Sequence, residues 1–307
     1  MKKIITLFLS IVILFSLFSC VPSSNNAKAD VITTCFPIYD IATHLLEDDK
    51  SVTLLLKPGQ DSHSYDPSAK DIVKIKSCDI FISIGGQDES WVKTLLEGND
   101  LKNVRSLFLI DSVPPLAYKE GHDENDGHDH SHAYDEHIWT SPKNMTTMLD
   151  TIKNELCQVF PDLKEEIDER ADKYLSDLND LDAELSTLVA NAKRNIVIFG
   201  DRFPFLHLFT DYSIEYDAAY PGCSEMTEPS AATIASLVNK VTAENIPVIF
   251  KTQLSNGRIA ESISVETGAK ILILHSLSTL TKDEWKNNET YYSIMRKNIE
   301  ALKSALN

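Results

Sequence analysis

Histidine is the residue type in this chain whose placement most directly suggests chemistry. The chain of 307 residues has nine histidines, and four of them fall within residues 121–132, GHDENDGHDHSH, among four acids and no Lys or Arg. Imidazoles bind zinc and other late first-row divalent ions, so this stretch could collect metal. It has no apolar periodicity, and we expect a flexible loop over 118–136. Flexible ligands must be ordered on binding, which predicts a weaker, auxiliary site; a solvated acidic loop is the alternative.

Three other histidines stand where the sequence predicts loops. His63 follows an apolar run and precedes a predicted helix over 67–77, His137 lies just before a helix that starts near residue 141, and His275 closes the apolar run ILIL. Imidazoles from separate loops can form a tetrahedral or more open metal site. For any one of them, a surface or capping role is the simpler interpretation. The other two histidines, His44 and His207, lie in predicted helices, and we expect packed positions.

The N-terminus is typical of an exported lipoprotein. Residues 1–19 have two lysines followed by a long apolar run, which indicates a signal peptide. Leu17-Phe18-Ser19-Cys20 resembles a lipobox, which predicts lipidation at Cys20 and a short tether over 20–30. A retained membrane anchor and a soluble secreted form are the alternatives.

Charge and cysteine content exclude several classes of protein. There are 29 basic and 46 acidic residues, a net charge of −17, which repels nucleic acid and anionic lipid and attracts cations. The cysteines have no CxxC pair, so the chain lacks the spacing of a zinc ribbon or a thioredoxin site. We expect Cys35 and Cys78 to be buried core residues. The spacing leaves open a disulfide between any of Cys35, Cys78, Cys157 and Cys223.

Short β-branched runs alternate with helical patterns, which predicts α/β layers with parallel sheets. Each half of the chain has four predicted strands, at 31–35, 52–56, 79–84 and 106–110 and at 195–199, 214–218, 247–251 and 271–274. Helices are predicted between them at 67–77, 88–97, 229–243 and 256–267. Two similar lobes follow, and ligands of such folds bind at the carboxyl ends of the strands.

One long helix is predicted between the halves. Pro161 divides residues 141–193 into a helix of about 18 residues and another of about 30. A 30-residue helix is roughly 45 Å long, so we expect it to bridge both lobes. A coiled-coil dimerisation arm is the alternative. The predicted organisation is an N-terminal lobe over 31–160, a bridging helix over 161–193 and a C-terminal lobe over 194–307.

Residues 31–307 resemble the solute-binding lipoproteins of bacterial zinc and manganese ABC importers, the cluster A-I family. The resemblance rests on PGQDSHSYDPSAKD around His63, DEHIWTSPKN around His137, GCSEMTEPS at 222–230 and HSLS at 275–278. It implies two α/β lobes joined by a rigid helix, with the metal in the cleft between them. It also implies His63 and His137 as ligands of the first lobe and His275 as a ligand of the second, where many members have Asp.

The sequence departs from this family pattern at Gly200. Members usually have His or Glu after the first strand of the second lobe, whereas this chain reads IVIFGDRFPF. The fourth ligand is therefore open among Asp201, Cys223, Glu225 and water. Asp201 could instead cap the helix that follows, and Cys223 could be an inert buried thiol. The four loop histidines resemble the His-rich insertion of zinc-importing members; they are His122, His128, His130 and His132.

The resulting hypothesis is a lipid-anchored, extracytoplasmic carrier that captures Zn²⁺ and delivers it to an ABC permease. We expect a monomer that binds no nucleic acid and is not an enzyme, because HExxH and GxSxG are absent from the sequence. Three imidazoles with at most one further donor favour zinc over Mn²⁺, which prefers carboxylates. A manganese carrier, a zinc-dependent hydrolase and an adhesin lipoprotein are the alternatives. We expect release through local shifts of the loops at His275 and at 222–228.

Overall fold

The computed structural model describes residues 30–60, 65–87, 89–98, 101, 103–117, 134–220 and 228–307. Several predictions concern residues outside these ranges: the signal peptide at 1–19, Cys20, His63, the loop histidines His122, His128, His130 and His132, and Cys223 and Glu225.

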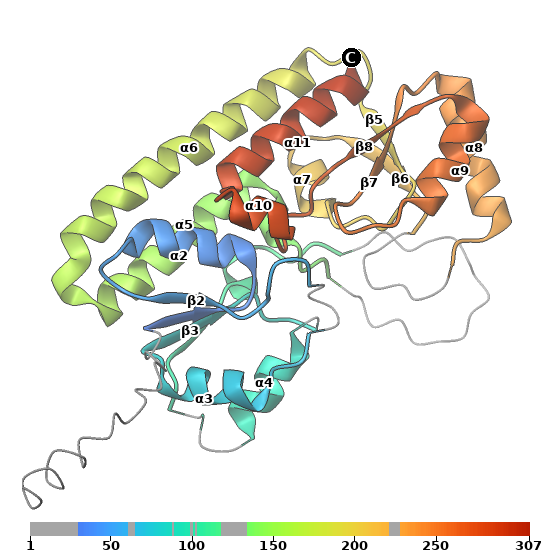
Figure 1. Ribbon diagram of the computed structural model, residues 1–307. Coiled ribbons are helices and arrows are strands. Elements are labelled where there is room, and N and C mark those ends of the chain that lie inside the picture. The colour runs from blue at the N-terminus through green and yellow to red at the C-terminus, as the bar shows by residue number, and fades with distance from the viewer. Residues whose placement is uncertain are drawn as a thin grey trace, which may run out of the picture.

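Two four-stranded parallel sheets form the framework of the molecule (Figure 1). The N-terminal sheet has the order β2-β1-β3-β4, and the C-terminal sheet has the order β6-β5-β7-β8. The strands of the N-terminal sheet are β1 (Val31–Thr33), β2 (Val52–Leu54), β3 (Ile80–Ser83) and β4 (Ser106–Phe108). Those of the C-terminal sheet are β5 (Ile196–Phe199), β6 (Glu215–Ala218), β7 (Val248–Lys251) and β8 (Lys270–Ile273). All eight predicted strands are confirmed.

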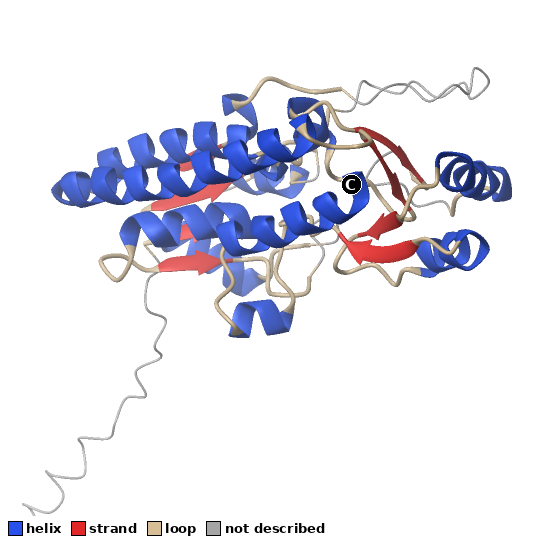
Figure 2. Ribbon diagram, turned by 90° about the horizontal axis from the view of Figure 1, so that it is seen from above, coloured by secondary structure: helices blue, strands red, loops and turns tan. Residues whose placement is uncertain are grey.

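Helices cover both faces of each sheet, as parallel sheets require. The outer face of the N-terminal sheet packs against α3 (Ala69–Ser77) and α4 (Ser90–Glu97), and that of the C-terminal sheet against α8 (Ala231–Glu244) and α9 (Arg258–Thr267). One continuous core joins the inner faces of both sheets and contains α2 (Phe36–Leu46), α7 (Leu206–Asp211) and α11 (Tyr291–Leu306). The sheets therefore share a single core, and Figure 2 shows the two sets of strands on either side of the middle of the molecule, with helices beside both.

The connecting helices have the predicted break. Helix α5 (Pro142–Val159) ends at Phe160, a 3₁₀ turn covers Pro161–Leu163, and α6 (Lys164–Ala190) follows with 27 residues. A helix of that length is about 40 Å long. It packs against α2 and α5 and also against α11. Its Arg170 forms an ion pair with Glu47, just past α2, and its Glu184 forms one with Arg296 of α11. The long helix thus lies along both sheets (Figure 1).

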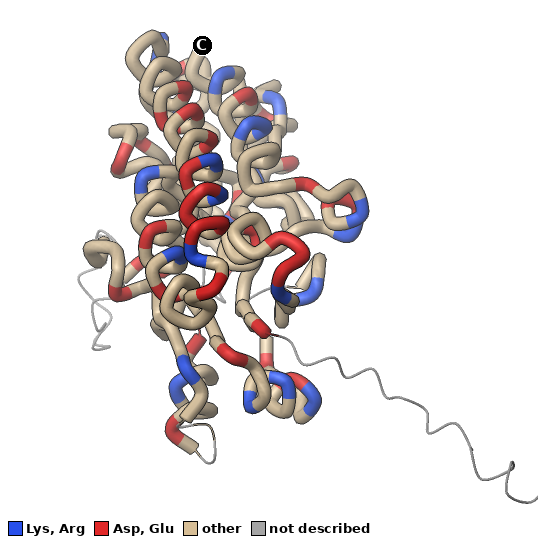
Figure 3. Tube along the Cα trace, turned by 90° about the vertical axis from the view of Figure 1, so that its left-hand side faces the viewer, with Lys and Arg blue, Asp and Glu red and all other residues tan. Residues whose placement is uncertain are grey.

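Figure 3 shows Asp, Glu, Lys and Arg spread over the helices of one side of the molecule. Many pairs of opposite charge lie one helical turn apart, such as Lys164 with Asp168 and Lys173 with Glu169. None of the helices in the described ranges is both long and apolar enough to cross a membrane.

Two predictions about side-chain burial need correction. His44 is not a fully packed helix residue, because 43% of its side chain is exposed, although its Nδ1 contacts Asp40 O and its ring lies edge-on to Tyr174 of α6. Cys35 is buried as predicted, but Cys78 is only half-buried because it lies just past the end of α3. Cys35 and Cys157 are free thiols, and the Cys78 thiol donates to the Ile75 carbonyl at 3.1 Å.

Candidate metal centre

His137 is held by a carboxylate two residues before it. Asp135 Oδ1 lies 2.6 Å from Nδ1 of His137 and also accepts the backbone N–H of His137 at 3.0 Å. Both residues are buried, and Thr140 Oγ1 donates to the carbonyl of His137. The short 3₁₀ turn Ile138–Thr140 and the start of α5 at Pro142 keep this segment rigid.

The charge of Asp135 determines which nitrogen of His137 carries the proton. Burial alone would raise the pKa of Asp135, but the neighbouring imidazoles of His137 and His207 and the hydrogen bonds from His137 lower it below its ordinary value. The ionised carboxylate can only accept hydrogen bonds, so Nδ1 of His137 is its donor. The neutral ring then has its lone pair on Nε2, which is the tautomer that binds a metal ion.

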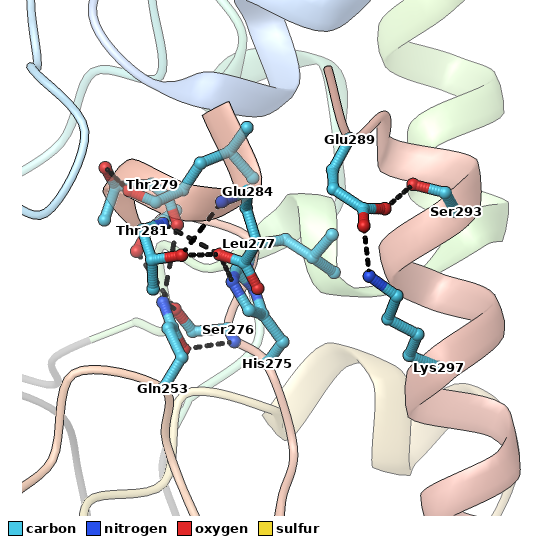
Figure 4. Close-up of polar contacts among 12 residues, drawn as sticks. Gln253, His275, Ser276, Leu277, Thr279, Thr281, Glu284, Glu289, Ser293 and Lys297 are labelled. Carbon is cyan, nitrogen blue, oxygen red and sulfur yellow. Dashed lines mark hydrogen bonds and ion pairs between the residues drawn. The ribbon is translucent and has the colours of Figure 1, made fainter. Parts of the chain in front are cut away.

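His275 is held in the opposite tautomer (Figure 4). Its Nδ1 accepts the backbone N–H of Leu277 at 2.9 Å, so Nδ1 carries no proton. The proton is on Nε2, which lies 3.2 Å from Glu284 Oε2 and donates to it. Burial would raise the pKa of Glu284, but hydrogen bonds from His275 and Thr281 lower it to about 2. Both ring nitrogens of His275 are therefore occupied within the C-terminal half.

The loop after β8 joins the two sheets. Trp139 packs against the His137 ring at 5.2 Å between centroids and donates its indole N–H to Ser276 O. Further along the loop, Ser278 O accepts from Phe36 N just past β1, and Leu280 O accepts from Gly59 N just past β2. His63 lies four residues beyond Gly59 in the sequence. Described residues of three segments, Phe36 after β1, Gly59 after β2 and Trp139 beside His137, thus contact residues 276–280.

Asp201 does not cap a helix, which corrects one of its two predicted roles. Its Oδ2 accepts from the backbone N–H and the hydroxyl of Thr252, both at 2.8 Å, so it ties the end of β5 to the end of β7. Helix α7 begins only at Leu206, too far along the chain for Asp201 to cap it. Asp201 also lines a cavity of about 300 Å³ together with Arg202, Tyr220, Glu228 and Arg258.

The structure explains the glycine at position 200, where the resemblance led us to expect a ligand. A Cβ atom on Gly200 would lie 2.5 Å from the Cα of Ala260 in α9, closer than van der Waals contact allows. The residue before Asp201 therefore has to be glycine here, because α9 packs directly on the end of β5.

His207 is a packed helix residue, as predicted. It is 4% exposed, and its two nitrogens contact Asp135 O at 3.0 Å and Asn144 Nδ2 at 3.1 Å. Asn144 Nδ2 also donates to Ile138 O, so the amide nitrogen faces His207 Nδ1 and Nε2–H donates to Asp135. Helix α7 therefore supports the segment that carries His137.

No three His, Cys, Asp or Glu side chains form a metal-binding group within the described ranges. His137 and His275 are each paired with a carboxylate of their own, on segments that Trp139 links. Sequence reasoning missed both carboxylates. Asp135 could have been noticed two residues before His137, and the Thr281-x-x-Glu284 pattern predicts a helix cap, which the structure has, but not the contact with His275.

The fold and these loops define an α/β protein with two parallel sheets, a long connecting helix and buried histidines before α5 and after β8. The chain belongs to the zinc-uptake complex component A (ZnuA) family, whose model, described as periplasmic, matches residues 31–305.

Individual relatives cover nearly the whole chain. The zinc-binding lipoprotein AdcA of Streptococcus pneumoniae is 32% identical over 99% of this chain, which spans 61% of that relative's length. The high-affinity zinc uptake system protein ZnuA of Bacillus subtilis is 30% identical, over 92% of this chain and 89% of its own. The crystal structure of the Zn(II)-bound ZnuA-like domain of pneumococcal AdcA superposes with a TM-score of 0.75 at 30% identity, covering 91% of this chain and 99% of that domain.

Proposed function

We propose that this chain captures Zn²⁺ outside the cytoplasmic membrane and delivers it to an ABC importer. Family membership supports this, together with the names of relatives called a zinc-binding lipoprotein and a high-affinity zinc uptake protein. The observation that carries the proposal is the buried pair Asp135–His137, in which the carboxylate leaves Nε2 of the imidazole as the metal-binding atom.

The proposed ligands are His63, His137 and His275, with the fourth position taken by Asp201, Cys223, Glu225 or water. His275 joins the site only after its ring leaves Glu284, because Nε2 is protonated in the observed arrangement. We propose that the loop histidines collect zinc more weakly; they are His122, His128, His130 and His132. Zinc is the cargo here and not a resident cofactor, and Mn²⁺ is the alternative cargo.

The location and the partners belong to the same proposal. Lipidation at Cys20 after removal of residues 1–19 would anchor the protein to the outer face of the cell membrane through the tether at 20–30. The name of the pneumococcal relative as a lipoprotein supports the anchor. The partner is an ABC permease, and we propose that the carrier acts as a monomer with an N-terminal lobe, a bridging helix at 161–193 and a C-terminal lobe.

Metal content tests the proposal. The mature protein is exposed to an equimolar mixture of Zn²⁺, Mn²⁺ and Co²⁺, with one equivalent of each metal per chain, desalted and analysed by mass spectrometry. We expect about one zinc per chain in the wild type, with clear losses in His63→Ala, His137→Ala and His275→Ala. His44→Ala is the matched control, because His44 is solvent-exposed and lies outside the proposed site.

The alternatives give different results in the same experiment. Deletion of residues 119–132 should keep the tight zinc and remove only weaker binding. Retention of Mn²⁺ in place of zinc would favour the manganese carrier, and a wild type that retains no metal would exclude transport of either. Hydrolysis of model esters or peptides by the zinc-loaded protein would favour the hydrolase.

A further inference from the structure

We propose that Glu284 competes with zinc for His275 and so sets the affinity of the site. This inference rests on the proposed function, because it takes His275 as a ligand. In the observed arrangement Glu284 Oε2 accepts three hydrogen bonds: from His275 Nε2 at 3.2 Å, from Thr281 N at 2.8 Å and from Thr281 Oγ1 at 2.8 Å. Figure 4 shows Thr281 and His275 on either side of this carboxylate.

Two contacts together keep His275 from binding metal. The Leu277 N–H points at Nδ1, so a proton on Nδ1 would meet another donor. A neutral imidazole that binds metal through Nε2 must carry its proton on Nδ1. Zinc binding therefore moves the proton from Nε2 to Nδ1 through solvent, with no net proton released. It also breaks the contacts of His275 with Glu284 and Leu277.

The loop that carries these contacts is fixed at its flanks and strained at Leu277. Leu277 is buried and has φ = +63°, a left-handed conformation that is unfavourable for a branched side chain. That conformation directs its N–H at His275. The flanks are fixed, because Asn298 of α11 bonds both N and O of His275, and Gln253 bonds both N and Oγ of Ser276. With these flanks fixed, the change that remains possible is rotation of the His275 ring together with relaxation of the Leu277 backbone.

Glu284 would then act during both capture and release. Zinc must displace the carboxylate to gain His275, which weakens binding relative to a free imidazole. When zinc leaves, Glu284 takes back the ring and prevents rebinding through His275. A hydrogen bond to a charged group changes an equilibrium constant by about tenfold or more.

Glu284→Gln tests this competition. Glutamine keeps an oxygen acceptor for Thr281 and remains compatible with the helix cap, but it loses the charge that holds His275. We expect zinc to bind about tenfold more tightly to this variant in chelator competition. Glu289→Gln is the matched control: it removes one carboxylate at the next helix start, where Glu289 bonds Ser293 and Lys297 and not His275. In Figure 4 these three residues form a separate group.

The tautomer of His275 gives a second, spectroscopic test. In ¹H–¹⁵N spectra of the imidazoles we expect the His275 proton on Nε2 without zinc and on Nδ1 with zinc, whereas His137 keeps its proton on Nδ1 in both states. A His275 proton on Nδ1 in the zinc-free protein would overturn the inference. So would a Glu284→Gln variant that binds zinc no better than Glu289→Gln. If the wild type binds no zinc at all, the proposed function fails as well.

Discussion

Asp135 and Glu284 each hold one histidine, but they select opposite tautomers. Asp135 accepts from Nδ1 of His137 over 2.6 Å, and Glu284 accepts from Nε2 of His275 over 3.2 Å. The first arrangement leaves Nε2, the nitrogen that we propose as the metal ligand, without a proton, and the second protonates it. Under the proposed function, His137 is therefore ready to bind metal, whereas His275 has to change its tautomer first.

Replacing Asp135 should weaken zinc binding without unfolding the protein. In Asp135→Asn the amide no longer stabilises the Nδ1–H tautomer of His137, and loss of such a partner typically costs 10- to 100-fold in metal affinity. Competition with a chromophoric chelator measures the change. Asp150→Asn on the surface of α5 is the control, since its side chain is 58% exposed. Equal affinities of the two variants would contradict a role for Asp135.

Zinc affinity should depend on pH through the histidine ligands. Imidazoles bind metal only when neutral, and their ordinary pKa is about 6.5, so we expect the affinity to fall progressively below about that pH. Isothermal titration at pH 7.5, 6.5 and 5.5 measures the change. An affinity that stays constant down to pH 5.5 would exclude histidine ligation.

We expect that a histidine at position 200 cannot serve as a ligand. In Gly200→His the new Cβ would collide with the backbone of Ala260, so we expect a loss of about 2 kcal/mol or more in the free energy of unfolding and no gain in zinc affinity. Urea denaturation and chelator competition measure the two quantities. A stable variant that binds zinc more tightly would show that α9 can move away from β5.

The hydroxyl of Tyr174 should anchor α6 to α2. Tyr174 Oη donates to the buried Asp40 Oδ2 at 2.7 Å, and Tyr174→Phe would leave that oxygen without its donor. We expect a loss of about 1–3 kcal/mol in the free energy of unfolding. Tyr292→Phe is the control, because its hydroxyl only contacts Arg296 at an exposed position. Similar losses in the two variants would argue against the anchor.

Glu89 should make stability depend on pH. Burial raises its pKa from 4.5 to about 7, against the hydrogen bond from Gly85 N. The folded state therefore holds the proton more tightly than the unfolded state, and stability falls as pH rises from about 4.5 to 7. By the upper end of this pH range, ionisation of Glu89 lowers the free energy of unfolding by roughly 3 kcal/mol.

Glu89→Gln should remove that dependence and make the protein more stable than wild type at pH 8. Urea denaturation at pH 5 and pH 8 measures both effects. Glu97→Gln, at an exposed position on α4, serves as the control. The prediction is contradicted if the free energy of unfolding of the wild type, measured relative to Glu89→Gln, rises between pH 5 and pH 8.

The arrangement of strands and helices could be predicted because its signals are local. Buried parallel strands are short apolar runs, and the break before α6 follows from Pro161, so both are visible in a few consecutive residues. The position of His137 just before the helix at Pro142 follows from the sequence for the same reason. The position of His275 at the carboxyl end of β8 also follows from the apolar run before it.

Only the tertiary structure decided what these side chains contact. The tautomer of His275 depends on Glu284, nine residues away, and on an N–H that Leu277 presents in a left-handed conformation. Asp201 bonds Thr252 across two strand ends, and Gly200 is required by the backbone of Ala260. Composition and periodicity show which residues are buried and in which element. The protonation state of an imidazole and the space beside a glycine depend on atoms brought close by folding, from distant parts of the chain.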